Sequence, residues 1–382
     1  MNVLHVTRDF PPRHHGGISS AVDRLARAQS HAGLGVAVVS FDAWRPCAAP
    51  RGRTAATRDA SDGIAVLRLT STQQLAAALA FASEQHPALL HVHDGMLWSF
   101  SATLRGELAV PAVQSVHVVQ RYMNELRGTR ERTLSLAGEE AALAAAERVI
   151  APSRSAADVL LASHPSLAPR LRVVGHGIDD SPAARAAAAR HAADAGHGPL
   201  LAAGRFGDIK GTPELFDVTR AVLTRLPGAA VTIAGGVPAN RRVEARWRRR
   251  WQSRTPEPLQ TRARFTGWLD GAALAAHYHD AAALIVASRY ETFGLVALEA
   301  MLYGLPVAST TAGGLAELIV HGETGLLSPP QDAEALAEHA VALLSDPDLA
   351  RRLGQGGAAA VRSRHLWEFV LPELLAVYAE VV

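Results

Sequence analysis

Cysteine is almost absent from this 382-residue sequence, and with it the structures that cysteine builds. The single Cys47 can form neither an internal disulfide nor a metal site made of several thiolates. No run of about 18 apolar residues occurs, so the chain lacks the signal of a membrane-spanning helix. Residues 1–7 read as a short strand, without the basic region and cleavage site of a signal peptide. These absences predict a cytoplasmic protein with no transmembrane segment.

Lysine is nearly absent too. Of the 38 basic residues, 37 are arginine, and the one lysine is Lys210. Because the formal net charge is only +2, the sequence pI of about 9.0 reflects arginine usage and gives no reason to expect a nucleic-acid partner. An ammonium is a compact point charge, whereas a guanidinium is a planar fork. The one lysine is therefore a candidate for a specific charge contact.

Apolar residues are plentiful, at 48% of the chain against 19% charged residues. Ala-rich stretches alternate with short Val, Leu and Ile runs, a pattern that predicts α/β domains with parallel sheets. The length favours two domains. Residues 181–198, whose apolar members are nearly all alanine, read as the boundary, and residues 46–63 read as a loop. We therefore expect two doubly wound, Rossmann-like domains at 1–180 and 181–365, facing each other across a cleft.

The first half opens with a strand at 2–7, a loop containing Gly16 and Gly17, and a helix to about residue 31. A glycine-containing turn that leads into a helix N-terminus can cradle a phosphate or a sugar. A purely steric role for the two glycines is the other interpretation. Further strands are predicted at 36–41, 64–69, 88–92, 112–116, 148–151 and 171–174.

Histidines follow two predicted neighbouring strands of the first half. His91, His93 and Asp94 end one strand, and His117 ends the next. Because carboxyl ends of parallel strands share one edge of a sheet, we expect a polar cluster there. The same residues can supply zinc ligands on paper, but hydrogen-bonded structural histidines are the more common case. The prediction is a polar cluster without a metal ion.

Two glutamates lie around a strand-to-helix turn of the second half. The apolar run 282–287 predicts a buried strand, and helical spacing begins at Gly294. Glu291 then falls in the turn and Glu299 in the second turn of the helix. The alternative is that Glu291 is a dipole partner of the helix start and Glu299 a solvated surface charge. Glu299, however, has apolar neighbours, and a carboxylate there needs partners. The unpaired N–H groups near residues 294–296 form a ready anion site.

A glycine-rich turn at 204–211 follows the first strand of the second half, and it carries Arg205 and the single lysine, Lys210. Arginine can grip two phosphate oxygens while lysine adds a point charge, so this pair suits a diphosphate. The alternative is a pair of solvated surface cations.

Two other motifs have simpler explanations. Asp346-Pro347-Asp348 matches the Asp-x-Asp motif of metal-dependent glycosyltransferases, but its position before a helix favours capping. The stretch from Arg241 to Trp251 combines six arginines with two tryptophans. It could touch an anionic membrane, but a solvated helix with packed tryptophans is the favoured interpretation.

Taken together, these residues resemble retaining glycosyltransferases of family 4, whose GT-B architecture has two facing Rossmann-like domains. The resemblance rests on Glu291 and Glu299, with seven residues between them, and on the turn with Arg205 and Lys210. It departs at residues 175–179, Gly-His-Gly-Ile-Asp, where the family usually has Pro-Asn-Gly before a hydrophobic residue and Asp. Supporting features are Gly16-Gly17, His117, and the run 306–327 with Gly313-Gly314 and Glu317. In this family the C-terminal helix commonly crosses back to the first domain, so the resemblance also implies such a helix at about 366–382.

The resemblance implies a role for each motif. Arg205 and Lys210 would hold the donor diphosphate and stabilise the leaving group. Glu291 would contact hydroxyls of the donor sugar, and Glu299 those of the ribose. His117 would contact the sugar or the reacting centre, so the expected catalytic residues are His117, Arg205, Lys210 and Glu291. The other expected donor contacts are Gly16, Gly17, Gly235, Gly267, Trp268, Thr292, Phe293, Gly294 and Leu295. Neither a metal ion nor a tightly bound cofactor is expected.

The implied reaction is retaining transfer from a nucleotide-diphosphate sugar, with UDP favoured, to a small polar acceptor. A sugar, a polyol or an aminocyclitol fits, in a pathway such as antibiotic synthesis. Alternatives are a nucleotide-sugar epimerase of the same fold and a non-catalytic sugar-nucleotide binding protein. A phosphorylase would need pyridoxal phosphate on a lysine, and Lys210 is already placed in the diphosphate motif. The expected acceptor contacts are His93, Asp94, Tyr122, Asn124 and Glu125.

Overall fold

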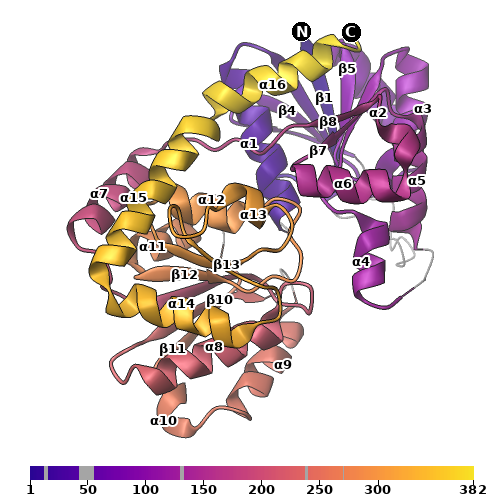
Figure 1. Cartoon of the computed structure of the whole chain (residues 1–382). Coiled ribbons are helices and arrows are strands. Elements are labelled where there is room, and N and C mark those ends of the chain that lie inside the picture. The colour runs from indigo at the N-terminus through magenta and orange to yellow at the C-terminus, as the bar shows by residue number, and fades with distance from the viewer. Residues whose placement is uncertain (13–15, 43–55, 130–132, 237–239, 270) are drawn as a thin grey trace. The chain divides into compact units, whose positions relative to one another are not determined.

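The computed structural model describes residues 1–12, 16–42, 56–129, 133–236, 240–269 and 271–382. Two compact units divide the chain. Unit 1 comprises Met1–Gly177 with Trp367–Val382, and unit 2 comprises Ile178–Leu366 (Figure 1). The predicted boundaries were 180/181 and about 365/366. In the described part of the chain, no helix combines the length and apolar character needed to cross a membrane.

Unit 1 is built on an eight-stranded sheet in the order β3-β4-β2-β1-β5-β6-β7-β8. Every neighbouring pair is parallel except β3 and β4. The strands are β1 (Asn2–Thr7), β2 (Gly35–Ser40), β3 (Thr57–Ser61), β4 (Ile64–Arg68), β5 (Leu89–Val92), β6 (Ala112–Ser115), β7 (Arg148–Ala151) and β8 (Leu171–Val173). The helices are α1 (Gly17–His31), α2 (Leu75–Gln85), α3 (Trp98–Leu108), α4 (Gln120–Leu126), α5 (Leu134–Ala145), α6 (Arg154–Ser163) and α16 (Trp367–Ala379).

The sheet of unit 1 is apolar on both faces because helices cover both. In β1, Leu4 belongs to the main core cluster on one face, whereas Val3 belongs to a smaller cluster on the other. That smaller cluster takes in Val370 and Leu374 of α16. The C-terminal helix therefore packs on the sheet of unit 1, next to α1 (Figure 1), as the family resemblance implied.

Unit 2 has a fully parallel six-stranded sheet in the order β11-β10-β9-β12-β13-β14. Its strands are β9 (Leu200–Arg205), β10 (Val231–Gly236), β11 (Ala263–Gly267), β12 (Ala283–Val286), β13 (Val307–Thr310) and β14 (Leu326–Ser328). Its helices are α7 (Pro182–Ala193), α8 (Thr212–Arg225), α9 (Arg241–Gln252), α10 (Glu257–Gln260), α11 (Gly271–Asp280), α12 (Leu295–Leu302), α13 (Leu315–Leu318), α14 (Ala333–Ser345) and α15 (Pro347–Arg364).

The predicted class, α/β with two parallel-sheet domains, is confirmed, and the structure differs from the local predictions in two places. Residues 181–198 contain helix α7, which packs on α11 and α15 with Ala184 and Ala187 fully buried. Alanine is small enough to let helices approach closely, so a low apolar area did not prevent packing. The described end of the predicted loop 46–63 is strand β3, which pairs antiparallel with β4 at the edge of the sheet. Residues 46–55 lie outside the described residues.

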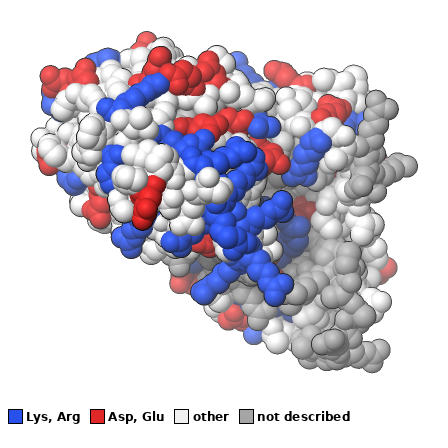
Figure 2. Space-filling view, turned by 90° about the horizontal axis from the view of Figure 1, so that it is seen from below, with Lys and Arg blue, Asp and Glu red and all other residues white. Residues whose placement is uncertain are grey.

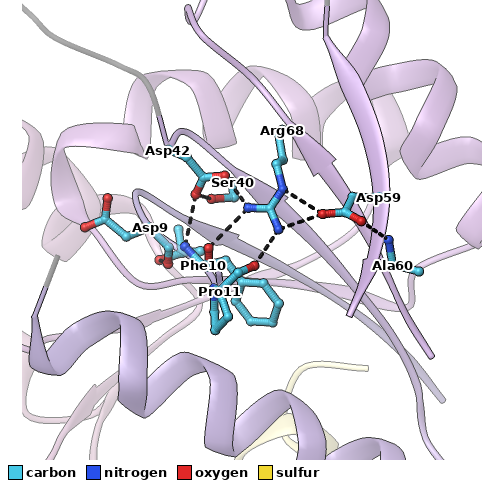
Figure 3. A network of polar contacts seen from close by, with 9 residues as sticks. Asp9, Phe10, Pro11, Ser40, Asp42, Asp59, Ala60 and Arg68 are labelled. Atoms are coloured by element: carbon cyan, nitrogen blue, oxygen red, sulfur yellow. Dashed lines mark hydrogen bonds and ion pairs between the residues drawn. The ribbon is translucent and has the colours of Figure 1, made fainter. Parts of the chain in front are cut away.

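A buried arginine holds the segment that follows β1 (Figure 3). Arg68 forms ion pairs with Asp42 and Asp59, and its guanidinium also donates to the backbone carbonyls of Phe10 and Pro11. The Asp42 side chain is 1% exposed and also accepts the N–H of Phe10 at 3.1 Å. This network fixes the backbone of residues 10 and 11, on the way to the Gly16-Gly17 turn.

A buried carboxyl group fixes the start of α4. Both oxygens of Glu139, on α5, lie within hydrogen-bonding distance of the Gln120 N–H, at 2.9 and 3.1 Å. The group thus caps a helix whose own N-cap residue, Val119, has no capping side chain. Burial raises the pKa of Glu139 from 4.5 to about 8, although the backbone N–H groups of Gln120 and Arg121 oppose the rise.

Replacing Arg68 by Met should strongly destabilise the protein. The substitution keeps the length of the side chain but leaves the Asp42 carboxylate buried without its cation, a loss of about 3–5 kcal/mol in the free energy of unfolding. Arg58→Met is the matched control, because it breaks an ion pair with Glu84 in which both side chains are about half exposed. Urea denaturation measures both variants. Equal losses in the two would contradict the role of the network.

Glu139 makes stability depend on pH in a defined direction. Its pKa is raised in the folded state, so its contribution is full below pH 4.5 and is lost as pH rises through about 8. Glu139→Gln removes this titration. We expect the stability of the variant, relative to wild type, to improve steadily between pH 5 and pH 9. Thermal unfolding of both proteins across this range measures the difference, and a difference that does not change with pH would contradict the assignment.

Candidate functional site

The centre of the site in unit 2 is an ion pair between two loops. Lys210 lies in the turn between β9 and α8, and Glu291 lies in the turn between β12 and α12. The Nζ atom of Lys210 is 2.7 Å from Oε1 of Glu291, and the hydroxyl of Ser288 donates to the same oxygen at 2.8 Å. The Lys210 side chain is 38% exposed and that of Glu291 16%. The pair is therefore held by the protein yet open to solvent.

These two loops are fastened to each other by further contacts. The N–H of Arg289 donates to the carbonyl of Ile209 at 2.8 Å, and the Arg289 guanidinium binds Glu214 of α8. Gly211 has a positive φ of 62°, and a Cβ there would lie 1.7 Å from the carbonyl oxygen of Ala287. Only glycine permits this approach. The position of Lys210 against Glu291 thus follows from the backbone of both loops.

The other predicted diphosphate contacts lie around the same edge of the sheet. Arg205 is the last residue of β9 and is exposed. Gly294 is the N-cap of α12 with a positive φ of 106°, and no side chain caps this helix. No side chain therefore caps its first N–H groups, as the predicted anion site requires. Thr292 and Leu295 are half-buried, whereas Phe293 is buried in the core.

Glu299 has the hydrogen-bonding partner that its apolar surroundings require. The hydroxyl of Tyr278, on α11, donates to Oε2 of Glu299 at 2.8 Å. Tyr278 is 2% exposed, and Glu299 is half-buried. Nothing in the sequence near the two glutamates pointed to Tyr278, because it belongs to a different helix.

The residues predicted to lie near the nucleobase end the two outer strands on this side of the sheet. Gly235 lies near the end of β10, Gly267 ends β11, and Trp268 follows it, half-buried. Glu244 of α9 lies beside these residues and was not predicted from the sequence. Its Oε2 would lie 3.2 Å from a Cβ placed on Gly267. The signal was present, since Glu244 is the one acidic residue in an arginine-rich helix.

Helix α9 confirms the interpretation of a solvated helix with packed tryptophans. Trp251 is 1% exposed and Trp247 packs against the same core cluster. One face of the molecule carries a dense group of basic side chains (Figure 2). The exposed arginines of α9 are Arg241, Arg242, Arg246, Arg248, Arg249 and Arg250.

In unit 1, the predicted histidine cluster forms at the carboxyl ends of β5 and β6. The rings of His91 and His93 lie 4.1 Å apart, and His93 lies 5.4 Å from His117. His5 of β1 joins them at 5.1 Å from His93. The sequence held a signal for His5, a polar residue inside an otherwise apolar strand. His176 stacks on His117 at 5.5 Å, and both rings line a small pocket, partly open to solvent, together with His91 and His93.

Burial keeps these imidazoles neutral. It lowers the pKa of His5 and of His117 to about 4, and lowers those of His91 and His93 well below the ordinary value. Possible metal-ligating atoms of His5, His91 and His93 lie within 4.8 Å of one another. The cluster is therefore the candidate metal site within the described residues.

The predicted acceptor residues differ in how exposed they are. His93 is buried, and its Nδ1 lies 3.2 Å from Nε2 of His117. Asp94 pairs with Arg8 at 3.3 Å. Of the α4 residues, Tyr122 is half-buried, Asn124 is buried and Glu125 is exposed. Gly16 is the N-cap of α1, and Gly17 is its exposed first residue.

Comparison with known proteins gives a consistent result for both units. Residues 15–181 match the family model described as Glycosyltransferase Family 4, and residues 198–346 match the model described as Glycosyl transferases group 1. A D-inositol 3-phosphate glycosyltransferase of Actinosynnema mirum is 30% identical over 315 residues, which cover 77% of this chain and 73% of the relative. A glycogen synthase of Mycobacterium tuberculosis is 28% identical over 99% of this chain and 94% of its own.

Solved structures agree on the fold. The sucrose-phosphate synthase of Thermosynechococcus elongatus matches with a TM-score of 0.78 and 25% identity, over 100% of this chain and 99% of the other. The predicted GT-B fold is thereby confirmed. The chain belongs to family 4 of the glycosyltransferases, retaining enzymes that transfer a glycosyl group from a nucleotide sugar.

Proposed function

We propose that this enzyme transfers a sugar from a UDP-sugar to a hydroxyl of a small polar acceptor such as a sugar, a polyol or an aminocyclitol. The observation that carries the proposal is the pair of Lys210 and Glu291 at the carboxyl edge of the unit 2 sheet. It sets a cation suited to phosphate 2.7 Å from a carboxylate suited to sugar hydroxyls, as a donor with both groups requires.

The donor diphosphate would bind between Arg205, Lys210 and the first N–H groups of α12. An ammonium has three donors, so Lys210 can keep its bond to Glu291 while it donates to phosphate oxygens. Glu291 would accept hydrogen bonds from hydroxyls of the donor sugar. Glu299, already oriented by Tyr278, would accept those of the ribose. The base would lie near Gly235, Gly267 and Trp268, with Gly17 close to the diphosphate.

The reaction would proceed by front-face displacement. As the bond to the anomeric carbon breaks, negative charge grows on the leaving phosphate, where Arg205 and Lys210 stabilise it more than in the ground state. A leaving phosphate oxygen would take the proton of the acceptor hydroxyl. These cations supply the charge stabilisation that a metal ion gives in other transferases, so the proposal needs no metal. His117 would contact the sugar or the reacting centre.

Related proteins support the choice of substrates. The Anabaena protein HepE, with the same fold at 18% identity, is named in complex with UDP-glucose. Besides the D-inositol 3-phosphate glycosyltransferases, a 2-deoxystreptamine N-acetyl-D-glucosaminyltransferase of Niallia circulans is 27% identical over 180 residues. By name, these relatives act on a cyclitol phosphate and an aminocyclitol. Asp94, Tyr122, Asn124 and Glu125 are the proposed acceptor contacts.

Lys210→Ala should impair use of the donor without unfolding the protein, because the side chain is partly exposed. Loss of charged hydrogen bonds worth about 1.5–3 kcal/mol should lower kcat/KM for the donor about 10- to 150-fold. Lys210→Arg is the matched variant, which keeps the charge but not the shape, and should recover only part of the activity. Steady-state kinetics with UDP-glucose as the first donor measure the effect. Wild-type kinetics in Lys210→Ala would contradict the diphosphate assignment.

The acceptor is tested by a panel of inositol phosphate, 2-deoxystreptamine, glycerol and glucose with UDP-sugars. We expect product with a cyclitol or sugar acceptor, with retained anomeric configuration by NMR. With an amine-bearing acceptor, Glu125→Ala should raise KM, because a carboxylate that pairs with the ammonium is lost. An unchanged KM would remove Glu125 from the acceptor site. Conversion of the donor without any acceptor would instead favour an epimerase, and absence of all turnover despite donor binding would favour a binding protein.

A further inference from the structure

A continuous chain of hydrogen bonds links the C-terminal helix to His117. The amide nitrogen of Gln29, on α1, donates to the hydroxyl of Tyr378, on α16, at 3.0 Å. Gln29 Oε1 lies 2.7 Å from Nε2 of His5, and Nδ1 of His5 lies 2.8 Å from Nε2 of His93. Finally, Nδ1 of His93 lies 3.2 Å from Nε2 of His117. The first four side chains are at most 2% exposed, whereas His117 is only half-buried.

The direction of every bond in this chain follows from Gln29. Its amide nitrogen faces Tyr378, so its carbonyl oxygen faces His5 and can only accept a hydrogen bond. Nε2 of His5 must therefore carry the proton, which leaves Nδ1 of this neutral ring as an acceptor. His93 must then donate from Nε2 and accept at Nδ1. By the same step His117 donates from Nε2, and its Nδ1 holds the lone pair.

A side branch obeys the same rule. The Tyr378 hydroxyl uses a lone pair for Gln29, so its own hydrogen can go to Nδ1 of His91, 2.6 Å away. Nε2 of His91 then donates to the hydroxyl of Ser115 at 2.7 Å. All four rings thus have the same protonated nitrogen, and one assignment satisfies the whole network.

A metal ion explains this cluster less well than the neutral network. The candidate ligand set of His5, His91 and His93 contains no carboxylate, so a divalent cation would be buried without a compensating charge. All six ring nitrogens of these residues already have hydrogen-bonding partners. Metal binding would have to replace several of these bonds.

We propose that Gln29 and Tyr378 are positioning residues that set the tautomer of His117, with the proton on Nε2 and the lone pair on Nδ1. Any hydrogen-bonding partner of Nδ1 must then be a donor. The relevance to catalysis rests on the proposed function, in which His117 contacts the sugar or the reacting centre. This chain of hydrogen bonds from Tyr378 to His117, the relay, also gives α16 a role beyond packing, because its Tyr378 keeps the Gln29 amide in one orientation.

Nitrogen-15 NMR of the unliganded protein with labelled histidine tests the tautomer directly, with His117 assigned from a His117→Asn variant. We expect the His117 proton on Nε2, with slow exchange and a coupling across the hydrogen bond to Nδ1 of His93. In Gln29→Met the first acceptor is lost, so the coupling should vanish and exchange of this proton should quicken at least about tenfold, a loss of roughly 1.4 kcal/mol of protection. A His117 proton on Nδ1 in the wild type would overturn the proposal.

Two further variants separate the relay from simple packing. Gln29→Glu keeps an acceptor toward Nε2 of His5 and should restore the wild-type His117 signals. Val377→Ala removes buried volume from α16 without touching a hydrogen bond, so it should leave them unchanged. Unchanged signals in Gln29→Met, or stoichiometric zinc in the purified protein, would overturn the relay.

Activity assays separate this proposal from the proposed function. If His117→Asn keeps full turnover while the NMR results hold, the catalytic role of His117 fails and the relay stands. If His117→Asn loses turnover and Gln29→Met keeps the wild-type His117 proton, the relay fails and the proposed function stands.

Discussion

The parallel order of the strands is the constraint on which the rest of the structure depends. In a parallel sheet, the carboxyl ends of neighbouring strands meet at one edge, and the loops there are brought together without regard to sequence distance. Lys210 and Glu291 are 81 residues apart and form an ion pair for this reason. The histidines of unit 1 gather at the corresponding edge of their own sheet. The strand topology thus brings the residues of each candidate site together, and their chemistry depends on that placement.

Two buried charged residues of unit 1, Arg68 and Glu139, fix the paths of loops. Arg68 binds two carbonyls of the segment after β1, and Glu139 caps the helix that follows His117. A buried polar group without a partner destabilises the fold by more free energy than its hydrogen bond contributes when formed. Each group therefore favours the one backbone path that supplies its partners. The histidine chain differs in one respect. What this chain fixes is the position of each proton on its imidazole ring, and neutral groups in a desolvated environment can keep these positions without a net charge.

The motifs that could be predicted from sequence lie within one turn or one helix. The spacing of Glu291 and Glu299, the glycines around Lys210 and the helix from Leu295 are local, so periodicity and residue type were sufficient. The partners of these residues could not be predicted in this way. Tyr378 and Gln29 are separated by 349 positions, and Tyr278 belongs to the helix before β12. Their contacts arise only when helices pack.

The differences from the prediction have the same origin. The alanine-rich stretch 181–198 was interpreted as the domain boundary, because composition reports apolar area and not the close approach that small side chains allow. Strand β3 was missed since an edge strand needs little apolar character of its own, and four of its five residues are exposed. The clustering of His91, His93 and His117 was predictable, because all three lie at or just after the carboxyl ends of neighbouring strands. The contribution of His5 and the direction of the hydrogen bonds required the structure.

The most direct test of the central claim, that the Lys210 loop holds the diphosphate of a nucleotide donor, is titration calorimetry with UDP, UMP and uridine in the presence of a chelator. The account predicts clear binding of UDP without metal, weaker binding of UMP and little binding of uridine, since the phosphates meet Arg205, Lys210 and the start of α12. Equal affinity for UDP and uridine would contradict it. Failure of all four nucleotide diphosphates (UDP, GDP, ADP and dTDP) to bind would also contradict it.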